Sequence, residues 1–201
     1  MKKVLSICLV LILVGFSFGQ EENNDIKRIG ISVNPLGFAQ FGPLVNLDIK
    51  IVKNLVLNGH IRFAPYGLLT RVMWQEDSSL DEFTGNAYGG GLVYYFGDKN
   101  GKPYAGILFE VDENKQVYAK GKDWEWVQNG DGLTVVANGG YRFRFNSGFF
   151  MNVGAYAGIY KNEWKWRSVH NYNPNETSGS GTTITPFGMV EFTLGFELIN
   201  K

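Results

Sequence analysis

The chain has 201 residues and a formal net charge of zero, and it contains 15% aromatic residues, 19% charged residues and 26 glycines. This aromatic content excludes an intrinsically disordered chain, and the lack of a basic excess argues against a nucleic-acid partner. Abundant glycine and aromatic residues with few charges favour an all-β fold, because glycine weakens helices and aromatic side chains suit strands.

Residues 1–19 are predicted to be a cleaved signal peptide. Two lysines precede the uncharged apolar run Val4–Phe18, which is shorter than the roughly 20 residues that a membrane-spanning helix needs. Small residues then form a cleavage signal that ends at Gly19. The single cysteine, Cys8, lies inside the run. The mature chain, residues 20–201, is therefore expected to be one domain without disulfides.

From residue 26 onward, hydrophobicity alternates with a period of two residues, which indicates β-strands. Eight strands are predicted, and most are close to the roughly 9–11 residues that a tilted strand needs to cross a bilayer. They cover residues 26–34, 43–52, 55–65, 84–96, 103–112, 133–145, 149–161 and 184–198.

The connections between these strands are predicted to alternate in length. The turns at 53–54, 97–102 and 146–148 are short, whereas the segments 66–83, 113–132 and 162–183 are long and polar. Short turns at one end and long loops at the other are typical of outer-membrane barrels, whose short turns face the periplasm. Within the last long loop, Ser178–Thr183 is expected to be a flexible segment.

Alternation alone does not say which face of the strands is buried. The polar face is poor in charge and rich in asparagine, glycine and tyrosine, which suits a crowded lumen better than a solvated exterior. Nine aromatic residues near the short turns are expected to form an interfacial girdle: Tyr94, Tyr95, Phe96, Tyr104, Phe143, Phe145, Phe149, Phe150 and Phe196. We therefore predict a transmembrane barrel, with a soluble secreted lipocalin-like binding barrel as an alternative.

The whole mature chain resembles small eight-stranded outer-membrane barrels of the outer-membrane protein A and X type, and the outer membrane protein beta-barrel domain proteins of Bacteroidetes. The resemblance rests on the signal peptide, the alternating strands and the final strand Gly188–Leu198. Such barrels usually end on an aromatic residue, whereas residues 199–201 follow Leu198 here. The resemblance implies an all-β, eight-stranded antiparallel up-and-down transmembrane barrel in the bacterial outer membrane, monomeric and in contact with lipid and lipopolysaccharide.

Charged residues of both signs share the predicted polar face. An eight-stranded barrel is barely wide enough for its own side chains, and buried charges persist when they are paired. We therefore predict an ion-pair network that plugs the lumen, with Arg28 and Glu197 as its best single pair. The network comprises Arg28, Asp48, Lys50, Arg62, Glu110, Arg142, Arg144, Glu191 and Glu197.

Two pairs of tryptophans lie in the long loops, Trp124 with Trp126 and Trp164 with Trp166. Each pair faces one side of an extended chain. Pairing outward from the turn at 146–148 places the second pair opposite residues 128–130, within reach of Trp126. One interpretation is an aromatic cluster at the barrel mouth that binds sugars or apolar partners. The other interpretation is an outer interfacial belt.

Catalytic and metal-binding signals are weak. Ser168 and His170 lie near Glu163 in a predicted loop and only faintly resemble the residues of lipid-modifying barrel enzymes. A flexible loop does not hold a nucleophile and its base in fixed geometry. His60 lies on the polar face and is expected to form hydrogen bonds in the lumen. No residues have metal-ligand spacing, so we predict no catalytic residues, no metal and no cofactor.

These observations favour a structural or interaction barrel that displays extracellular loops to a surface glycan or protein. The alternative within the same fold is a narrow pore or a barrel that transports a small ligand. The narrow lumen expected of eight strands favours the first class.

Overall fold

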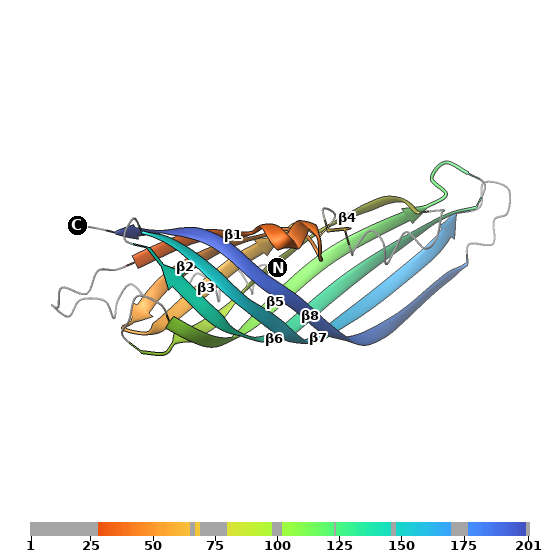
Figure 1. Ribbon diagram of the computed structural model, residues 1–201. Helices are drawn as coiled ribbons and strands as arrows, with labels where there is room; N and C mark the ends of the chain where they lie inside the picture. Colours follow the sequence, from red (N-terminus) through yellow and green to blue (C-terminus); the bar gives the residue numbers. More distant parts are fainter. Residues whose placement is uncertain are drawn as a thin grey trace.

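A computed structural model of the chain describes residues 28–64, 67–68, 80–97, 102–122, 124–145, 148–169 and 177–199. Eight antiparallel strands pair with their sequence neighbours, and the last pairs with the first, so the sheet closes into a barrel (Figure 1). The strands are β1 (Arg28–Asn34), β2 (Leu44–Val52), β3 (Leu55–Arg62), β4 (Leu80–Tyr95), β5 (Lys102–Tyr118), β6 (Glu125–Arg144), β7 (Phe149–Val169) and β8 (Ser178–Ile199). The eight-stranded antiparallel barrel predicted from the alternation is confirmed.

The pairing register staggers the strands around the ring. Paired residues lead from Ile31 in β1 through the intervening strands to Pro186 in β8, whereas Ile31 itself pairs with Phe196. The sheet therefore closes with a shift of ten residues, from 186 to 196. A stagger of this kind accompanies the roughly 35–45° strand tilt of small barrels, whose interior is just wide enough for side chains.

The strands β4 to β8 are longer than predicted. β5 continues to Tyr118 and β6 begins at Glu125, so most of the loop expected at 113–132 is strand. The same is true of 162–183, where Ser178–Thr183 pairs with β7 and is not a flexible loop. The prediction was wrong because it followed apolar alternation, which stops where outward side chains become polar, although backbone pairing continues.

These additional residues form an open sheet that continues past the ends of β2 and β3 (Figure 1). We call it the strand extension, and it consists of residues 80–86, 113–118, 125–131, 161–169 and 178–184. β3 pairs with β4 only as far as Ala87, and β1 pairs with β8 only as far as Leu194. Within the described chain, no strand therefore joins β8 to β4 at this level.

Burial alternates along the strands and separates two chemically different faces. The apolar side chains of Ile31, Leu47 and Phe109 are 50%, 43% and 53% exposed on the outside. The neighbouring charged side chains of Asp48 and Glu110 are each 7% exposed and face the interior. The barrel is therefore apolar outside and carries buried charged side chains inside, unlike a lipocalin-like barrel, whose apolar face is inward.

The aromatic residues at the short-turn end divide between these faces. Tyr94 and Phe96 are exposed, as the predicted girdle requires. Tyr95, Tyr104 and Phe150 are buried in the interior, so the girdle prediction was wrong for these three. Tyr95 illustrates the reason, because successive residues of a strand point to opposite faces.

Gly148, the residue before β7, is held by hydrogen bonds to Phe145 and Glu197. Gly148 adopts a φ of 82°, a left-handed conformation that glycine occupies without steric cost. Its N–H donates to the carbonyl of Phe145 at 3.1 Å, and its carbonyl accepts from the N–H of Glu197 at 2.8 Å. Gly148 is thereby attached to the end of β8, beside the start of β1.

The connection between β1 and β2 contains the 3-10 helix η1 (Pro35–Phe38) and is attached to β8. The Gln40 side chain donates to the carbonyl of Val190 at 3.2 Å and accepts from its N–H at 3.1 Å. Phe41 packs against the inward-facing Phe187, with ring centroids 5.2 Å apart. The connection therefore satisfies the backbone of β8 beyond the end of its pairing with β1. No helical segment among the described residues has the length and hydrophobicity needed to cross a membrane.

Candidate functional site: the barrel interior

Arg142 of β6 lies at the centre of the interior network. Its guanidinium donates to Asp48 of β2 at 2.6 Å and lies 3.4 Å from Glu197 of β8. Its Nε donates to the amide oxygen of Asn152 at 2.8 Å, and its Cζ lies 4.0 Å from the ring centroid of Phe150. Arg142 is only 3% exposed, so these partners compensate the loss of water that a buried cation suffers.

A continuous chain of polar contacts leads from this arginine towards the other end of the barrel. Asp48 accepts a hydrogen bond from Asn58 at 2.8 Å, and the amide oxygen of Asn58 lies 3.0 Å from Nδ1 of His60. Nε2 of His60 lies 3.5 Å from Glu110. Nε of Arg62 donates to both oxygens of Glu110 at 3.1 and 3.0 Å, and Nη2 contacts the same carboxylate. The sequence prediction of a lumen hydrogen-bonding role for His60 agrees with this arrangement.

Glu191 is held mainly by neutral hydrogen-bond donors. It accepts hydrogen bonds from the hydroxyl of Tyr104 at 2.6 Å, the amide of Asn152 at 3.1 Å and the hydroxyl of Thr193 at 3.1 Å. The Tyr104 hydroxyl reaches Glu191 by passing close to Gly140 of β6 and Gly154 of β7. A Cβ at Gly140 would lie 2.6 Å from that hydroxyl oxygen, so this path needs the space that glycine leaves.

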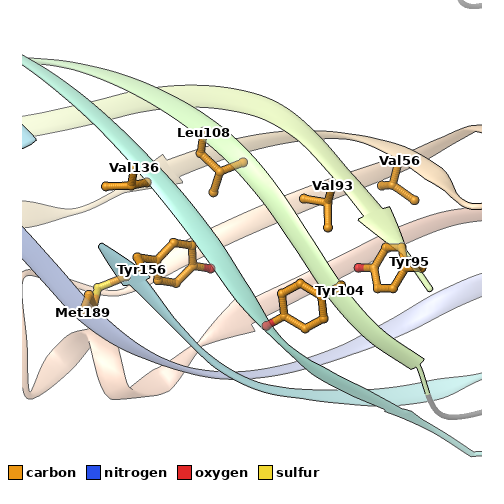
Figure 2. Close-up of a cluster of buried hydrophobic side chains, with 8 residues drawn as sticks. All are labelled: Val56, Val93, Tyr95, Tyr104, Leu108, Val136, Tyr156 and Met189. Atoms are coloured by element: carbon orange, nitrogen blue, oxygen red, sulfur yellow. The ribbon is translucent and has the colours of Figure 1, made fainter. Parts of the chain in front are cut away.

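A cluster of buried, mostly apolar side chains also lies in the interior (Figure 2). The cluster consists of Val56, Val93, Tyr95, Tyr104, Leu108, Val136, Tyr156 and Met189. Between it and the polar network lies a cavity of about 20 Å³, which has room for about one water molecule. Sequence reasoning missed this cluster because the residues of β4 and β5 alternate poorly between apolar and polar.

The structure brings most of the predicted network residues into the interior. Seven of them carry the ion pairs and hydrogen bonds just described or lie beside them: Asp48, Arg62, Glu110, Arg142, Arg144, Glu191 and Glu197. Arg144 lies 2.8 Å from Glu197. Lys50 is half-buried on the same face of β2.

The predicted pair of Arg28 and Glu197 lies outside what the structure describes, because the Arg28 side chain is not among the described side chains. The backbone register places Arg28 opposite Ile199 and Gly30 opposite Glu197. Sequence reasoning also missed the uncharged partners in the network, above all Asn58 and Tyr104. Each lies an even number of residues from a charged residue of the same strand and therefore on the same face, and this spacing could have identified them.

The tryptophans lie on the strand extension and beside it. Trp164 pairs with Gly130 and Trp166 with Gln128, which confirms the predicted register. The Trp164 indole N–H donates to the hydroxyl of Thr183 at 3.1 Å, and a Cβ at Gly179 would lie 2.6 Å from Nε1 of Trp166. Both indoles therefore reach the inner face of β8.

The other two tryptophans have different neighbours. Trp126 stacks on Tyr118 of β5, with ring centroids 3.8 Å apart and planes 3° apart. Trp124 is 47% exposed, and Nζ of Lys122 lies 6.0 Å from its ring centroid. The Trp126 indole of β6 thus packs on β5, the Trp164 and Trp166 indoles of β7 lie against β8, and Trp124 lies in the connection between β5 and β6.

An ion pair attaches that connection to β4. Nζ of Lys120 lies 2.7 Å from Glu82, and the Lys120 N–H donates to Asp81 at 2.6 Å. The hydrogen bond between the two side chains lowers the pKa of Glu82 and raises the pKa of Lys120. Glu82 belongs to the strand extension, and Lys120 lies in the connection between its strands β5 and β6.

The residues considered for catalysis are only partly described. Ser168 is buried opposite Trp126, and its N–H donates to the carbonyl of Thr177 at 2.8 Å. His170 lies outside the described residues. Among the side chains that the structure describes, no group of three or more His, Cys, Asp or Glu residues is placed to hold a metal ion.

The barrel is similar to a solved structure, the crystal structure of a major outer membrane protein from Thermus thermophilus. The similarity has a TM-score of 0.55 and covers 87% of this chain and 100% of that chain, with 8% sequence identity. At this identity, the similarity shows a shared fold. No family model and no curated protein matches the sequence.

Proposed function

We propose that this protein is an outer-membrane barrel with a plugged lumen, whose strand extension and connections form an interaction surface outside the membrane. The observation that carries this proposal is the set of buried ion pairs in the interior. Arg142 of β6 contacts Asp48 of β2 across the interior, Arg62 of β3 contacts Glu110 of β5, and a cavity between the interior side chains has a volume of about 20 Å³. A passage for solutes needs a connected, water-filled lumen, which wider barrels provide.

Three features support the membrane location. Closing the sheet pairs the backbone groups of the ring internally, which a lipid environment requires. The exterior carries apolar side chains such as Leu47 and Phe109, whereas charged side chains face inward. The outer-membrane protein from Thermus thermophilus has the same fold.

The strand extension supports the interaction role. Its inner face carries aromatic rings from three strands, including Trp126, Trp164 and Trp166. Amide side chains, among them Gln116 and Gln128, occupy neighbouring positions. Aromatic rings beside amides suit a surface glycan or a protein partner, because they combine apolar contact with hydrogen bonding.

Conductance tests the plugged lumen directly. Protein reconstituted in planar bilayers is expected to give no large and stable single-channel current, with insertion verified by flotation of proteoliposomes from the same preparation. A large, stable conductance would overturn the plugged lumen and favour the narrow-pore alternative. Replacing the Arg62–Glu110 pair by two alanines is the companion measurement, because any leak that it creates locates the barrier.

The membrane location has a separate test. The mature chain is expected to fractionate with outer membranes and to need detergent or lipid once purified. A mature protein that stays monomeric in detergent-free buffer would overturn the location. Binding to glycan arrays by the alanine variants of Trp164 and Trp166, compared with the wild type, tests the interaction role.

A further inference from the structure

Three acceptor oxygens lie without donors where the strand extension joins the barrel. They are Oδ2 of Asp112, Oδ1 of Asn114 and Oδ1 of Asn162, and each is buried without a hydrogen-bond partner. Asn114 is 7% exposed. Buried polar atoms normally have partners in the protein, an ordered water or an ion, so these oxygens point to a bound species.

Glycines of β6 bring these oxygens together. Gly130 pairs with Asn114, and Gly132 pairs with both Asp112 and Asn162. A Cβ at Gly130 would lie 2.7 Å from Oδ1 of Asn114 and 2.8 Å from Oδ1 of Asn162. Two amide oxygens from strands on either side of β6 therefore converge at one position on its inner face. The Asp112 carboxylate occupies the inner face of Gly132 in the same way.

The Asp112 carboxylate contacts no cation among the described residues, and Arg62, which is paired with Glu110, acts on it only through space. Oδ1 of Asp112 accepts hydrogen bonds from the amide of Asn114 at 3.0 Å and the hydroxyl of Tyr160 at 3.2 Å, and both donors are neutral. Within the described residues, Asp112 forms no ion pair, whereas Glu110 two residues earlier is paired with Arg62. One carboxylate oxygen, Oδ2 of Asp112, and two amide oxygens without donors match a cation and repel an anion.

We propose that Asp112, Asn114 and Asn162 bind a hard cation of the calcium type at the mouth of the barrel. Carboxylate and amide oxygens at about 2.3–2.6 Å are preferred calcium ligands, and water completes the coordination. With one carboxylate, the affinity is expected in the weak range of extracellular calcium modules, with a Kd of about 10⁻⁴–10⁻³ M. The ion connects β5 to β7 across β6.

Calcium titration of the purified, folded protein in detergent tests this proposal, after removal of metals with a chelator. Isothermal calorimetry is expected to show one saturable site per chain, and Tb³⁺ is expected to give luminescence sensitised by the nearby aromatic rings and displaced by Ca²⁺. Asp112→Asn is expected to weaken binding by about tenfold or more, because it removes the only carboxylate of the site.

Asp131→Asn is the matched control, because Asp131 lies beside Gly130 and Gly132 but is exposed on the outer face. Its binding is expected to equal that of the wild type. Asn162→Asp adds a second carboxylate and is expected to tighten binding by about tenfold, a gain that misfolding cannot produce.

Three results would overturn the site. The first is the lack of saturable Ca²⁺ binding at millimolar concentration, which would show that water and not a cation is the partner of these oxygens. The second is equal weakening by Asp112→Asn and Asp131→Asn, which would place the ion on the outer face. The third is an Asn162→Asp variant that binds no tighter than the wild type. None of these results bears on conductance or on membrane location, so the proposed function is tested separately.

Discussion

Arg142 contacts two carboxylates from different strands, and this decides how the interior responds to mutation. Its positive charge offsets Asp48 of β2 and Glu197 of β8 in a region with almost no access to solvent. Breaking a buried ion pair by removing one partner is far more costly than its net contribution to stability, because the remaining charge is left without water or a counter-ion. Arg142 therefore matters for stability mainly because it compensates the charges of two buried carboxylates, and less because of the net stabilisation that the ion pairs add.

Replacing this arginine is expected to destabilise the barrel strongly. Arg142→Met keeps an apolar stem but leaves the carboxylates of Asp48 and Glu197 with weaker compensation, and we expect a loss of about 3–5 kcal/mol. The measurement is equilibrium unfolding by urea in lipid vesicles, followed by tryptophan fluorescence. Arg167→Met removes the same charge from an exposed position and is expected to change stability little, so equal effects would contradict a charge-compensating network.

The ion pair between Lys120 and Glu82 makes a prediction about titration. The hydrogen bond to Lys120 is the main cause of the lowered pKa of Glu82, so Lys120→Met is expected to raise that pKa towards its ordinary value of 4.5. Because the folded state has the lower pKa, the stabilising contribution is present above the ordinary value and is lost as pH falls through the lowered one.

Nuclear magnetic resonance titration of the Glu82 carboxyl carbon measures this shift. Lys122→Met removes a neighbouring charge that does not contact Glu82 and serves as the control. An unchanged Glu82 titration in Lys120→Met would show that the contact with Lys120 does not form in solution.

Along β6, two adjacent glycines face different environments. Gly140 faces inward, and a Cβ there would lie 2.6 Å from both the Tyr104 hydroxyl and Cα of Gly154. Gly139 faces outward, and a Cβ there would find its nearest neighbour at 3.5 Å. The strand therefore tolerates an added methyl group on one face and not on the other.

Gly140→Ala is expected to destabilise the barrel by about 1–3 kcal/mol, the usual cost of overpacking. It is also expected to weaken the hydrogen bond between Tyr104 and Glu191. Gly139→Ala is expected to be neutral or slightly stabilising, because alanine restricts the unfolded chain. Comparing the two variants by heat-dependent mobility in gels and by urea unfolding separates crowding on the inner face of β6, by the Val153 carbonyl oxygen, Gly154 and Tyr104, from a general effect of alanine in this strand.

The strands show where sequence reasoning succeeds and where it stops. Period-two alternation located all eight strands because outward-facing apolar side chains alternate with inward-facing polar ones in the ring. The alternation did not predict β5 beyond residue 112. Outward positions such as Glu113 and Lys115 are charged there, although the backbone still pairs with β6. Backbone hydrogen bonds do not depend on the hydrophobicity of the side chains, so the hydrophobic pattern could not predict the strand extension.

The candidate site, like the strands, was predictable only in part. The alternation along each strand identified the charged residues that face inward, because they occupy every second position among apolar residues. It could not identify which partners meet, since Arg142 and Asp48 come from strands that are not adjacent in the sheet. Contacts across a lumen depend on the stagger of the closed ring, which no local pattern contains.

The exterior of the molecule as a whole makes the membrane location testable by substitution. Leu47 lies near the middle of β2 and is exposed among apolar neighbours. Leu47→Arg is expected to cost about 2–4 kcal/mol in lipid vesicles, the cost of a cation near the bilayer midplane. Glu113→Arg, on the strand extension, is expected to cost far less. Equal, small effects of the two substitutions would show that Leu47 does not face lipid.

The interior network also bears on how the barrel assembles. Asp48 lies on the second strand, Arg142 on the sixth and Glu197 on the last. Their contacts form only once the last strand pairs with the first and the ring closes. A partly assembled sheet would hold the same charges without their partners, and in lipid such charges are costly. For the proposed outer-membrane barrel, closure and charge neutralisation would therefore be one event, and half-inserted states would be disfavoured.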